Sequence, residues 1–90
     1  MNLGSERPLA TWSVRLFARA KDLAGTETID VALPTPATVG DLRRQLAGQC
    51  PKLAGLLERS AVAVDGDFAR DEQPLATGAE VALLPPVSGG

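Results

Sequence analysis

Apolar and polar residues alternate in two segments near the start of the chain, which is typical of half-buried β-strands. Segments 13–19 and 28–33 both show this alternation. The apolar positions that would face a core are Val14, Leu16, Ala18, Ile29, Val31 and Leu33. The intervening segment 21–25 ends in a glycine and is expected to be a loop. We therefore expect an antiparallel hairpin with a connection longer than a tight two-residue turn.

A longer period replaces this alternation after Thr38 and predicts the main helix of the fold. Apolar residues recur at helical spacing, at Val39, Leu42, Leu46, Ala47 and Cys50. Thr38 and Asp41 have the spacing of a capping box, and Pro51 is expected to end the helix. The charged residues of the opposite arc, among them Arg43 and Arg44, are interpreted as a solvated face. Segment 52–59 predicts a short second helix.

The rest of the chain predicts strands. Segment 61–64 is a short apolar run followed by Asp65-Gly66, a strong hairpin signal, and 67–70 is the expected return strand. Segment 80–84 is a further buried strand. The order β-β-α-(α)-β-β-β predicts an α+β roll, with one layer of sheet and one helix across it.

The last six residues form a distinct tail. They are Pro85, Pro86, Val87, Ser88, Gly89 and Gly90. The two prolines stop the preceding strand and stiffen the chain, and the glycines allow bare backbone to pass through a narrow channel. We interpret this as a tail that is threaded into a partner's active site, with the carboxylate of Gly90 as the reacting group. The alternative is a frayed terminus, where glycine and serine ordinarily collect.

Composition excludes several classes of function. The 90 residues include 9 basic and 11 acidic ones, no histidine, no tyrosine and a single cysteine. Nucleic-acid binding is disfavoured because there is no basic patch, and no apolar run is long enough to span a membrane. We expect a cytoplasmic protein without a metal or cofactor of its own, with Cys50 as core filler. The expected organisation is a disordered leader (1–11), one domain (12–84) and the flexible tail (85–90).

From residue 13 onward the chain resembles the β-grasp sulfur carriers and ubiquitin-like proteins. Within that group, segment 83–90 (LLPPVSGG) is similar to the small subunits of molybdopterin synthase, as are segments 14–19 and 23–25. The sequence differs where Asp65 and Ala79 replace the family's frequent asparagine and acidic residue. The resemblance implies a mixed sheet of four to five strands packed on one main helix and a short second helix. It also implies that the first and last strands run parallel at the centre of the sheet.

The same resemblance implies a chemistry for the tail. An adenylating enzyme similar to ubiquitin-activating enzymes would join Gly90 to AMP, using ATP and magnesium, and a sulfurtransferase would supply sulfur for a thiocarboxylate. The large synthase subunit, in an expected heterotetramer, would take up the tail and pass the sulfur to a cyclic pyranopterin precursor. The chain would not be catalytic alone.

Three further residues are candidates for a partner-binding face on the sheet. They are Phe17, Phe68 and Leu75, and for each of them packing in the core is the alternative. Other functions also remain open. The chain could carry sulfur for thiamin, cysteine or tRNA thiolation, act as a ubiquitin-like protein modifier, or be an interaction domain whose tail does no chemistry.

Overall fold

The structure is a computed structural model that describes residues 7–86. The strands are β1 (Leu9–Leu16), β2 (Thr28–Pro34), β3 (Ala37–Thr38), β4 (Ala61–Val64), β5 (Asp67–Ala69), β6 (Pro74–Leu75) and β7 (Val81–Leu84). The helices are α1 (Ala18–Ala24), α2 (Val39–Gln49), the 3-10 turn η2 (Pro51–Leu53) and α3 (Ala54–Leu57).

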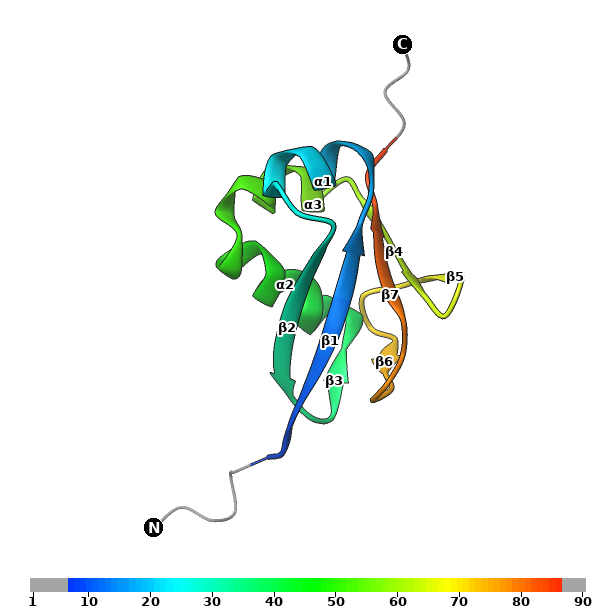
Figure 1. Cartoon of the computed structure of the whole chain (residues 1–90). Helices are drawn as coiled ribbons and strands as arrows, with labels where there is room; N and C mark the ends of the chain where they lie inside the picture. The colour runs from blue at the N-terminus through cyan, green and yellow to red at the C-terminus, as the bar shows by residue number, and fades with distance from the viewer. Residues whose placement is uncertain (1–6, 87–90) are drawn as a thin grey trace.

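Five strands form one mixed sheet in the order β2-β1-β7-β4-β5 (Figure 1). The first and last strands, β1 and β7, run parallel at its centre, where Arg15 pairs with Ala82. All other pairs in this sheet are antiparallel. This confirms the mixed sheet and the central parallel pair that the family resemblance implied.

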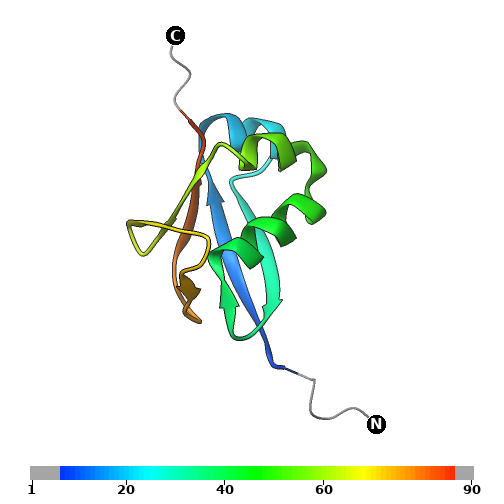
Figure 2. The ribbon, with the colours of Figure 1, turned by 180° about the vertical axis from the view of Figure 1, so that it is seen from behind.

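The helices cover one face of the sheet (Figure 2). The hydrophobic core consists of buried side chains from the sheet and from the helices. From the sheet, β1 contributes Trp12, Val14 and Leu16, each exposed by no more than 2%. The core residues of α2 are Val39, Leu42 and Leu46, as its helical period predicted. The indole N–H of Trp12 donates to the carbonyl of Ala76 at 2.9 Å, so its one polar atom is paired inside the core.

The connection between β1 and β2 differs from the expected loop. The strand ends at Leu16, and the helix α1 occupies most of the segment that we expected to be strand end and loop. Its residues are good helix formers, and Ala20 is fully buried against the core. Gly25 ends the helix in the left-handed conformation (φ 74°). Gly25, which the sequence analysis placed at the end of a loop, is therefore the C-cap of α1.

The ordered domain begins earlier than the predicted boundary at residue 12. Leu9 already belongs to β1 and is paired with Pro34, and Thr11 is paired with Ala32. The prediction of a disordered leader is wrong for residues 9–11, because these residues take part in the ladder with β2. Residues 1–6 lie outside the described part of the chain.

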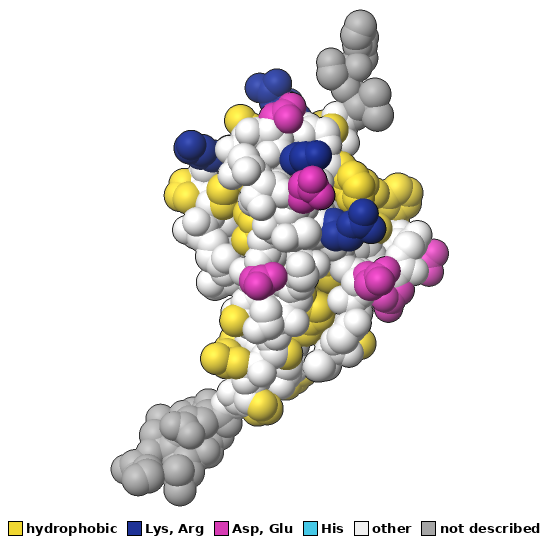
Figure 3. All heavy atoms as spheres, viewed as in Figure 1, with side chains coloured by type: hydrophobic (Ala, Val, Ile, Leu, Met, Phe, Trp, Pro, Cys, Tyr) yellow, Lys and Arg dark blue, Asp and Glu magenta, His cyan; other side chains and the backbone are white. Residues whose placement is uncertain are grey.

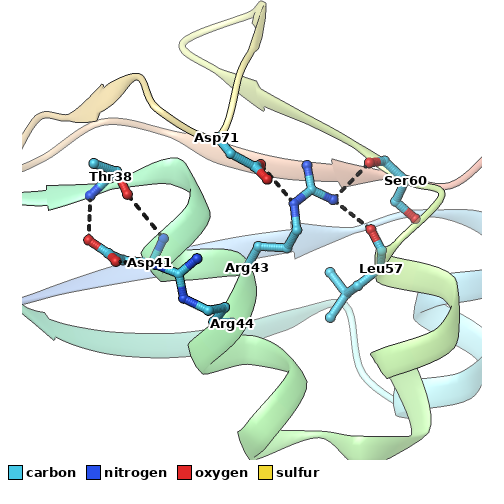
Figure 4. A network of polar contacts seen from close by, with 7 residues as sticks. All are labelled: Thr38, Asp41, Arg43, Arg44, Leu57, Ser60 and Asp71. Carbon is cyan, nitrogen blue, oxygen red and sulfur yellow. Dashed lines mark hydrogen bonds and ion pairs between the residues drawn. The ribbon is translucent and has the colours of Figure 1, made fainter.

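The start of α2 has the predicted capping box (Figure 4). The backbone N–H of Asp41 donates to Thr38 Oγ1 at 3.2 Å, and the N–H of Thr38 donates to Asp41 Oδ2 at 2.9 Å. That second bond is the main reason why the pKa of Asp41 lies below its ordinary value of 3.8. Arg44, 2.6 Å from Asp41 Oδ1, contributes to the same shift.

Arg43 does not belong to a purely solvated face, which corrects the sequence interpretation. Its guanidinium donates to the carbonyls of Leu57 and Ser60 and to the carboxylate of Asp71 (Figure 4). Only 20% of its side chain is exposed. Arg43 therefore fastens α2 to the end of α3 and to the start of β4, the strand that lies beside β7.

Candidate functional site: the tail root and the outer face of the sheet

The tail leaves the protein from the middle of the sheet. The strand that precedes the tail, β7, lies between β1 and β4. The last residue pair between β7 and β4 is Leu84 with Ala61. Pro85 and Pro86 follow outside any strand, at the same end of the sheet as α1 (Figure 1). Neither proline has an N–H to continue the ladder, so pairing ends where the sequence predicted. Pro85 and Pro86 form the tail root.

The predicted reactive part of the tail lies beyond the tail root. Val87, Ser88, Gly89 and Gly90 are outside the described residues. The described domain fixes the point in space at which these four residues begin. Because β7 is held on both sides by neighbouring strands, that starting point is fixed to the centre of a five-stranded sheet.

On the face of the sheet opposite the helices, β4 and β7 present mainly small apolar side chains, whereas β1 and β2 present polar ones such as Ser13 and Asp30. Along β7, Val81 and Leu83 are buried in the core, so Ala82 and Leu84 point to the other side. The register places Ala82 between Arg15 and Ala63, and Ala63 opposite Phe68. We call this surface the outer face; its residues are Arg15, Phe17, Ala61, Ala63, Phe68, Ala82 and Leu84.

Two of the three predicted partner-binding residues belong to this outer face. Phe68 on β5 is 76% exposed and Phe17, directly after β1, is 38% exposed. Figure 3 shows apolar side chains gathered on this side, next to the end of the sheet where the tail root lies. The guanidinium of Arg15 lies 5.3 Å from the centre of the Phe17 ring, within the range of a cation–π contact. Both aromatic residues are thus available to a partner, and their role in binding remains a prediction.

Leu75, the third candidate, does not belong to the outer face. It is only 5% exposed, pairs with Ala37 in a separate two-stranded sheet, and joins the hydrophobic core. The prediction that Leu75 binds a partner is therefore wrong. Its neighbour Pro74 takes the exposed position of this short strand, so the alternation of β6 places Leu75 inside.

A hollow of about 160 Å³ lies in the outer face between β1 and β4. Its lining residues are Arg15, Ala63, Gly66, Glu80, Val81 and Ala82. Sequence reasoning missed this hollow, because it depends on which small residues the register brings side by side. The signal was present only as two alanines, Ala63 and Ala82, at outward positions of β4 and β7.

Residues 7–86 contain no cluster of ligands suited to a metal ion. Cys50 is half-buried at the end of α2 and packs against the core, as expected for a filler. No helix among the described residues is long and apolar enough to cross a membrane.

Similarity to known proteins agrees with this arrangement. Residues 14–90 match the ThiS family. The chain belongs to the ThiS family. The molybdopterin synthase sulfur carrier subunit of Escherichia coli K12 is 39% identical over 79 residues, which cover 86% of this chain and 96% of that relative. The small archaeal modifier protein 1 of Haloferax volcanii is 37% identical over 84 residues, 84% of this chain and 97% of its own.

Solved structures confirm that this ThiS-family chain has a ubiquitin-like β-grasp fold. The crystal structure of small archaeal modifier protein 1 from Haloferax volcanii superposes with a TM-score of 0.80 and 34% identity, covering 90% of this chain and all of that one. A complex of subunits 1 and 2 of the molybdopterin-converting factor from Helicobacter pylori contains a similar chain. That chain has a TM-score of 0.62 and 25% identity, with 89% of this chain and 99% of the other covered.

Proposed function

We propose that this ThiS-family chain is a sulfur carrier and serves as the small subunit of a molybdopterin synthase. The observation that carries the proposal is the central strand β7, which runs into two prolines and then into Val-Ser-Gly-Gly. Similar proteins named as molybdopterin synthase sulfur carrier subunits support it, at 39% identity in Escherichia coli and 33% in Dictyostelium discoideum.

The reacting group in this proposal is the carboxylate of Gly90. A carboxylate is a poor electrophile at neutral pH, so it must first be activated. One carboxylate oxygen attacks the α-phosphorus of ATP and pyrophosphate leaves, which joins Gly90 to AMP. A sulfur nucleophile then attacks the acyl carbon and AMP leaves. With hydrosulfide delivered by the sulfur donor as that nucleophile, a C–S bond replaces the C–O bond to AMP, the carbonyl oxygen stays, and the S–H proton is lost to solvent. The end of the chain is then a thiocarboxylate, whose anionic sulfur is nucleophilic as thiolates are.

Acid–base groups for these steps belong to partners in this proposal. The chain has no histidine, the commonest general base of enzymes. An adenylating enzyme would supply the ATP site and magnesium, and a sulfurtransferase would supply sulfur. The carrier itself contributes a loadable end at a defined position, so its contribution to rate is positional.

The large synthase subunit is the proposed acceptor of the loaded tail. The outer face and the tail root adjoin each other, so one partner can cover Phe17 while it takes up Val87 and the residues that follow. The two-subunit complex from Helicobacter pylori supports a partner of this type. We expect the full assembly to contain two copies of each subunit, with the sulfur passed to a cyclic pyranopterin precursor in the cytoplasm.

Intact-mass spectrometry tests the proposal. The chain is produced with and without its adenylating enzyme and sulfurtransferase, and its mass is measured. Loading replaces one oxygen by sulfur, so the co-produced chain should be heavier by the mass difference between those two atoms. A variant that lacks Gly90 is the matched control. An unchanged mass of the complete chain in the presence of both enzymes would contradict the proposal.

A second candidate function is protein modification through an amide bond between Gly90 and target lysines. The relative from Haloferax volcanii, named small archaeal modifier protein 1, favours it. Denaturing gels of cells that produce the tagged chain separate the two functions. A ladder of high-mass conjugates indicates a modifier, whereas a complex with a large subunit that dissociates in denaturant indicates a carrier. Sulfur carriage for thiamin, cysteine or tRNA thiolation would leave the chain loaded without that large subunit.

A further inference from the structure

Two arginines lie on either side of the tail root. Arg19 belongs to the first turn of α1, which follows β1, and Arg59 stands one residue before the start of β4. The strands β1 and β4 are the two neighbours of β7 in the sheet. Both views of the fold show α1 and the segment that enters β4 next to the tail root (Figures 1 and 2). We call Arg19 and Arg59 the arginine collar.

Both side chains of the arginine collar are exposed. Within residues 7–86, the cations that form ion pairs are Lys21, Arg43 and Arg44, and neither collar residue is among them. A solvated guanidinium keeps its five N–H donors available for a planar anionic group. The end of the domain that presents the tail therefore carries binding capacity that the fold itself does not use.

Acidic residues near the tail root leave the collar a net positive charge. Asp22 lies on the same helix as Arg19, and Glu58 precedes Arg59. No ion pair within residues 7–86 joins either carboxylate to the collar, and Glu58 instead lines a hollow beside α2. With Arg15 on the adjoining outer face, arginines outnumber these two carboxylates, although the chain as a whole has a net charge of −2. The tail root is thus a locally basic part of an acidic chain.

The collar is separated from the reacting end by the length of the tail. Four residues, 87–90, follow the tail root, and a fully extended chain of that length spans at most roughly 14 Å. When Gly90 reaches the bottom of a partner's pocket, the tail root lies at the mouth of that pocket. The collar then faces protein groups around the mouth and not the phosphates of a nucleotide bound at the bottom.

We propose that the arginine collar recognises an acidic rim around the pocket in which the adenylating enzyme takes up the tail. Carboxylates are the protein groups that match a guanidinium in charge and shape, because the two can form paired hydrogen bonds. This inference rests on the proposed function, to which it adds the residues that recognise the activating partner and the chemistry of that partner's surface.

The transient nature of this encounter favours the adenylating enzyme as the partner of the collar. The carrier must bind that enzyme and leave it again in every round of loading. Complementary charges at an interface speed association more than they slow dissociation, which suits a short encounter. The collar lies outside the outer face that the proposed function assigns to the large subunit.

ATP–pyrophosphate exchange with the purified adenylating enzyme tests the collar, because it measures formation of the acyl adenylate at Gly90. The double variant Arg19→Gln, Arg59→Gln should raise the KM for the carrier about fivefold or more and leave kcat within about twofold. The matched control, Arg7→Gln with Arg70→Gln, removes the same charge at exposed positions. Arg7 precedes β1 and Arg70 lies beside the acidic loop that starts at Asp71, so the control should keep the KM of the wild type.

Salt and a conservative variant separate charge from shape. The KM of the wild type should rise between about 50 and 300 mM NaCl, and more steeply than that of the collar variant, because salt screens exposed charges. Arg19→Lys with Arg59→Lys keeps the charge and should restore most of the lost affinity. Thermal melts establish that every variant is folded. Equal KM values and equal salt dependence of the collar variant and the control overturn the proposal.

The outcomes separate this inference from the proposed function. Exchange by the wild type that is unaffected by the collar substitutions retains the function and overturns the collar. A wild-type chain that supports no exchange at all overturns both. Calorimetry with the large subunit completes the test, since the collar variant should change that Kd less than about threefold. A greater loss with the large subunit than with the adenylating enzyme overturns the assignment of the collar.

Discussion

Arg43 donates from its guanidinium to the carbonyl of Ser60 at 2.9 Å, and this bond joins the main helix to the strand beside β7. The same side chain reaches Leu57 and Asp71 (Figure 4). Ser60 is itself buried, and its hydroxyl donates to the carbonyl of Leu56 at 2.7 Å. Partly buried carbonyls that lose their donor carry a desolvation cost, so the network stabilises the sheet that holds the tail root.

Arg43→Met should therefore destabilise the domain by about 2 kcal/mol, because it leaves two partly buried carbonyls without their charged donor. The free energy of unfolding is measured by urea denaturation, with circular dichroism as the signal. Arg44→Met is the matched control, since Arg44 lies next to it on α2 but is 73% exposed and makes one surface ion pair. The control should cost no more than about 1 kcal/mol. Equal losses in the two variants would contradict the role assigned to Arg43.

Two glycines of α2 should respond in opposite ways to alanine. At Gly40 an added Cβ would lie 3.2 Å from both the Cβ and the carbonyl oxygen of Asp71, while nothing lies within 4 Å at Gly48. Asp71 cannot move away freely, because its carbonyl accepts from Gly40 N at 2.8 Å and its carboxylate is bound by Arg43. Gly48→Ala should stabilise by up to about 1 kcal/mol through helix propensity.

Gly40→Ala should lose stability despite the same gain in helix propensity, because the steric contact outweighs it. The net effect expected is about 1 kcal/mol of destabilisation. Urea midpoints of the two variants, measured side by side, decide the question. If Gly40→Ala instead raises the free energy of unfolding, the segment around Asp71 moves to accommodate the new methyl group and the expected steric clash is absent.

Asp41 should make stability depend on pH in the acid range. Its pKa in the folded state is below the ordinary 3.8, first because the Thr38 backbone N–H donates to the carboxylate. A lowered folded pKa means that the ionised carboxylate stabilises the fold above about pH 4 and that this contribution disappears as pH falls through the folded pKa. The stability difference between wild type and Asp41→Asn should therefore narrow from pH 6 to pH 3. A difference independent of pH would contradict this.

Gly89→Leu should abolish sulfur transfer to the pterin precursor without changing the unfolding free energy. The proposed reason is that a bulky side chain does not pass the channel to the acceptor's active site. Single-turnover assays with the thiocarboxylated chain and the large subunit measure this, and Ser88→Ala is the matched control. Removal of Gly90 should also abolish transfer. Full activity of either disrupted tail would refute the assignment of the tail as the reacting segment.

Phe17→Ala should weaken the complex with the large subunit. Phe17 lies on the outer face near the tail root, and an aromatic residue buried in an interface typically contributes more than about 1 kcal/mol. Isothermal titration calorimetry should show at least about a fivefold rise in Kd. Leu9→Ala, an equally apolar truncation at a distant exposed site, should leave the Kd unchanged. A similar loss in both variants would place the docking face elsewhere.

Periodicity predicted the elements whose amphipathic pattern is strong. The capping box of Thr38 and Asp41, the buried stripe of α2 and the Asp65-Gly66 turn all stand where the sequence placed them. Helix α1 was missed because its seven residues contain a single fully buried side chain, too few for a visible helical period. Gly25 marked its end, but a glycine also ends a loop.

The features that the sequence did not predict depend on contacts between residues far apart in the chain. Phe17, Phe68 and Leu75 look alike as apolar residues near strand ends, and only the pairing partners distinguish them. Leu75 pairs with Ala37 and turns inward, whereas Phe68 pairs with Ala63 on the open side of the sheet. The role of Arg43 likewise depends on Ser60, which is 17 residues away in sequence.

The parallel pair of β1 and β7 also bears on the order of events during translation. Strand β1 is the first described element in chain order, and its inner neighbour β7 is the last to be synthesised. The central position of the sheet cannot be filled until β7 has been synthesised. Pairing between strands that are far apart in sequence is also slow to form. A polypeptide that still lacks β7 therefore lacks the strand that fixes the tail root, and under the proposed function only chains whose synthesis has passed the end of β7 would be loaded.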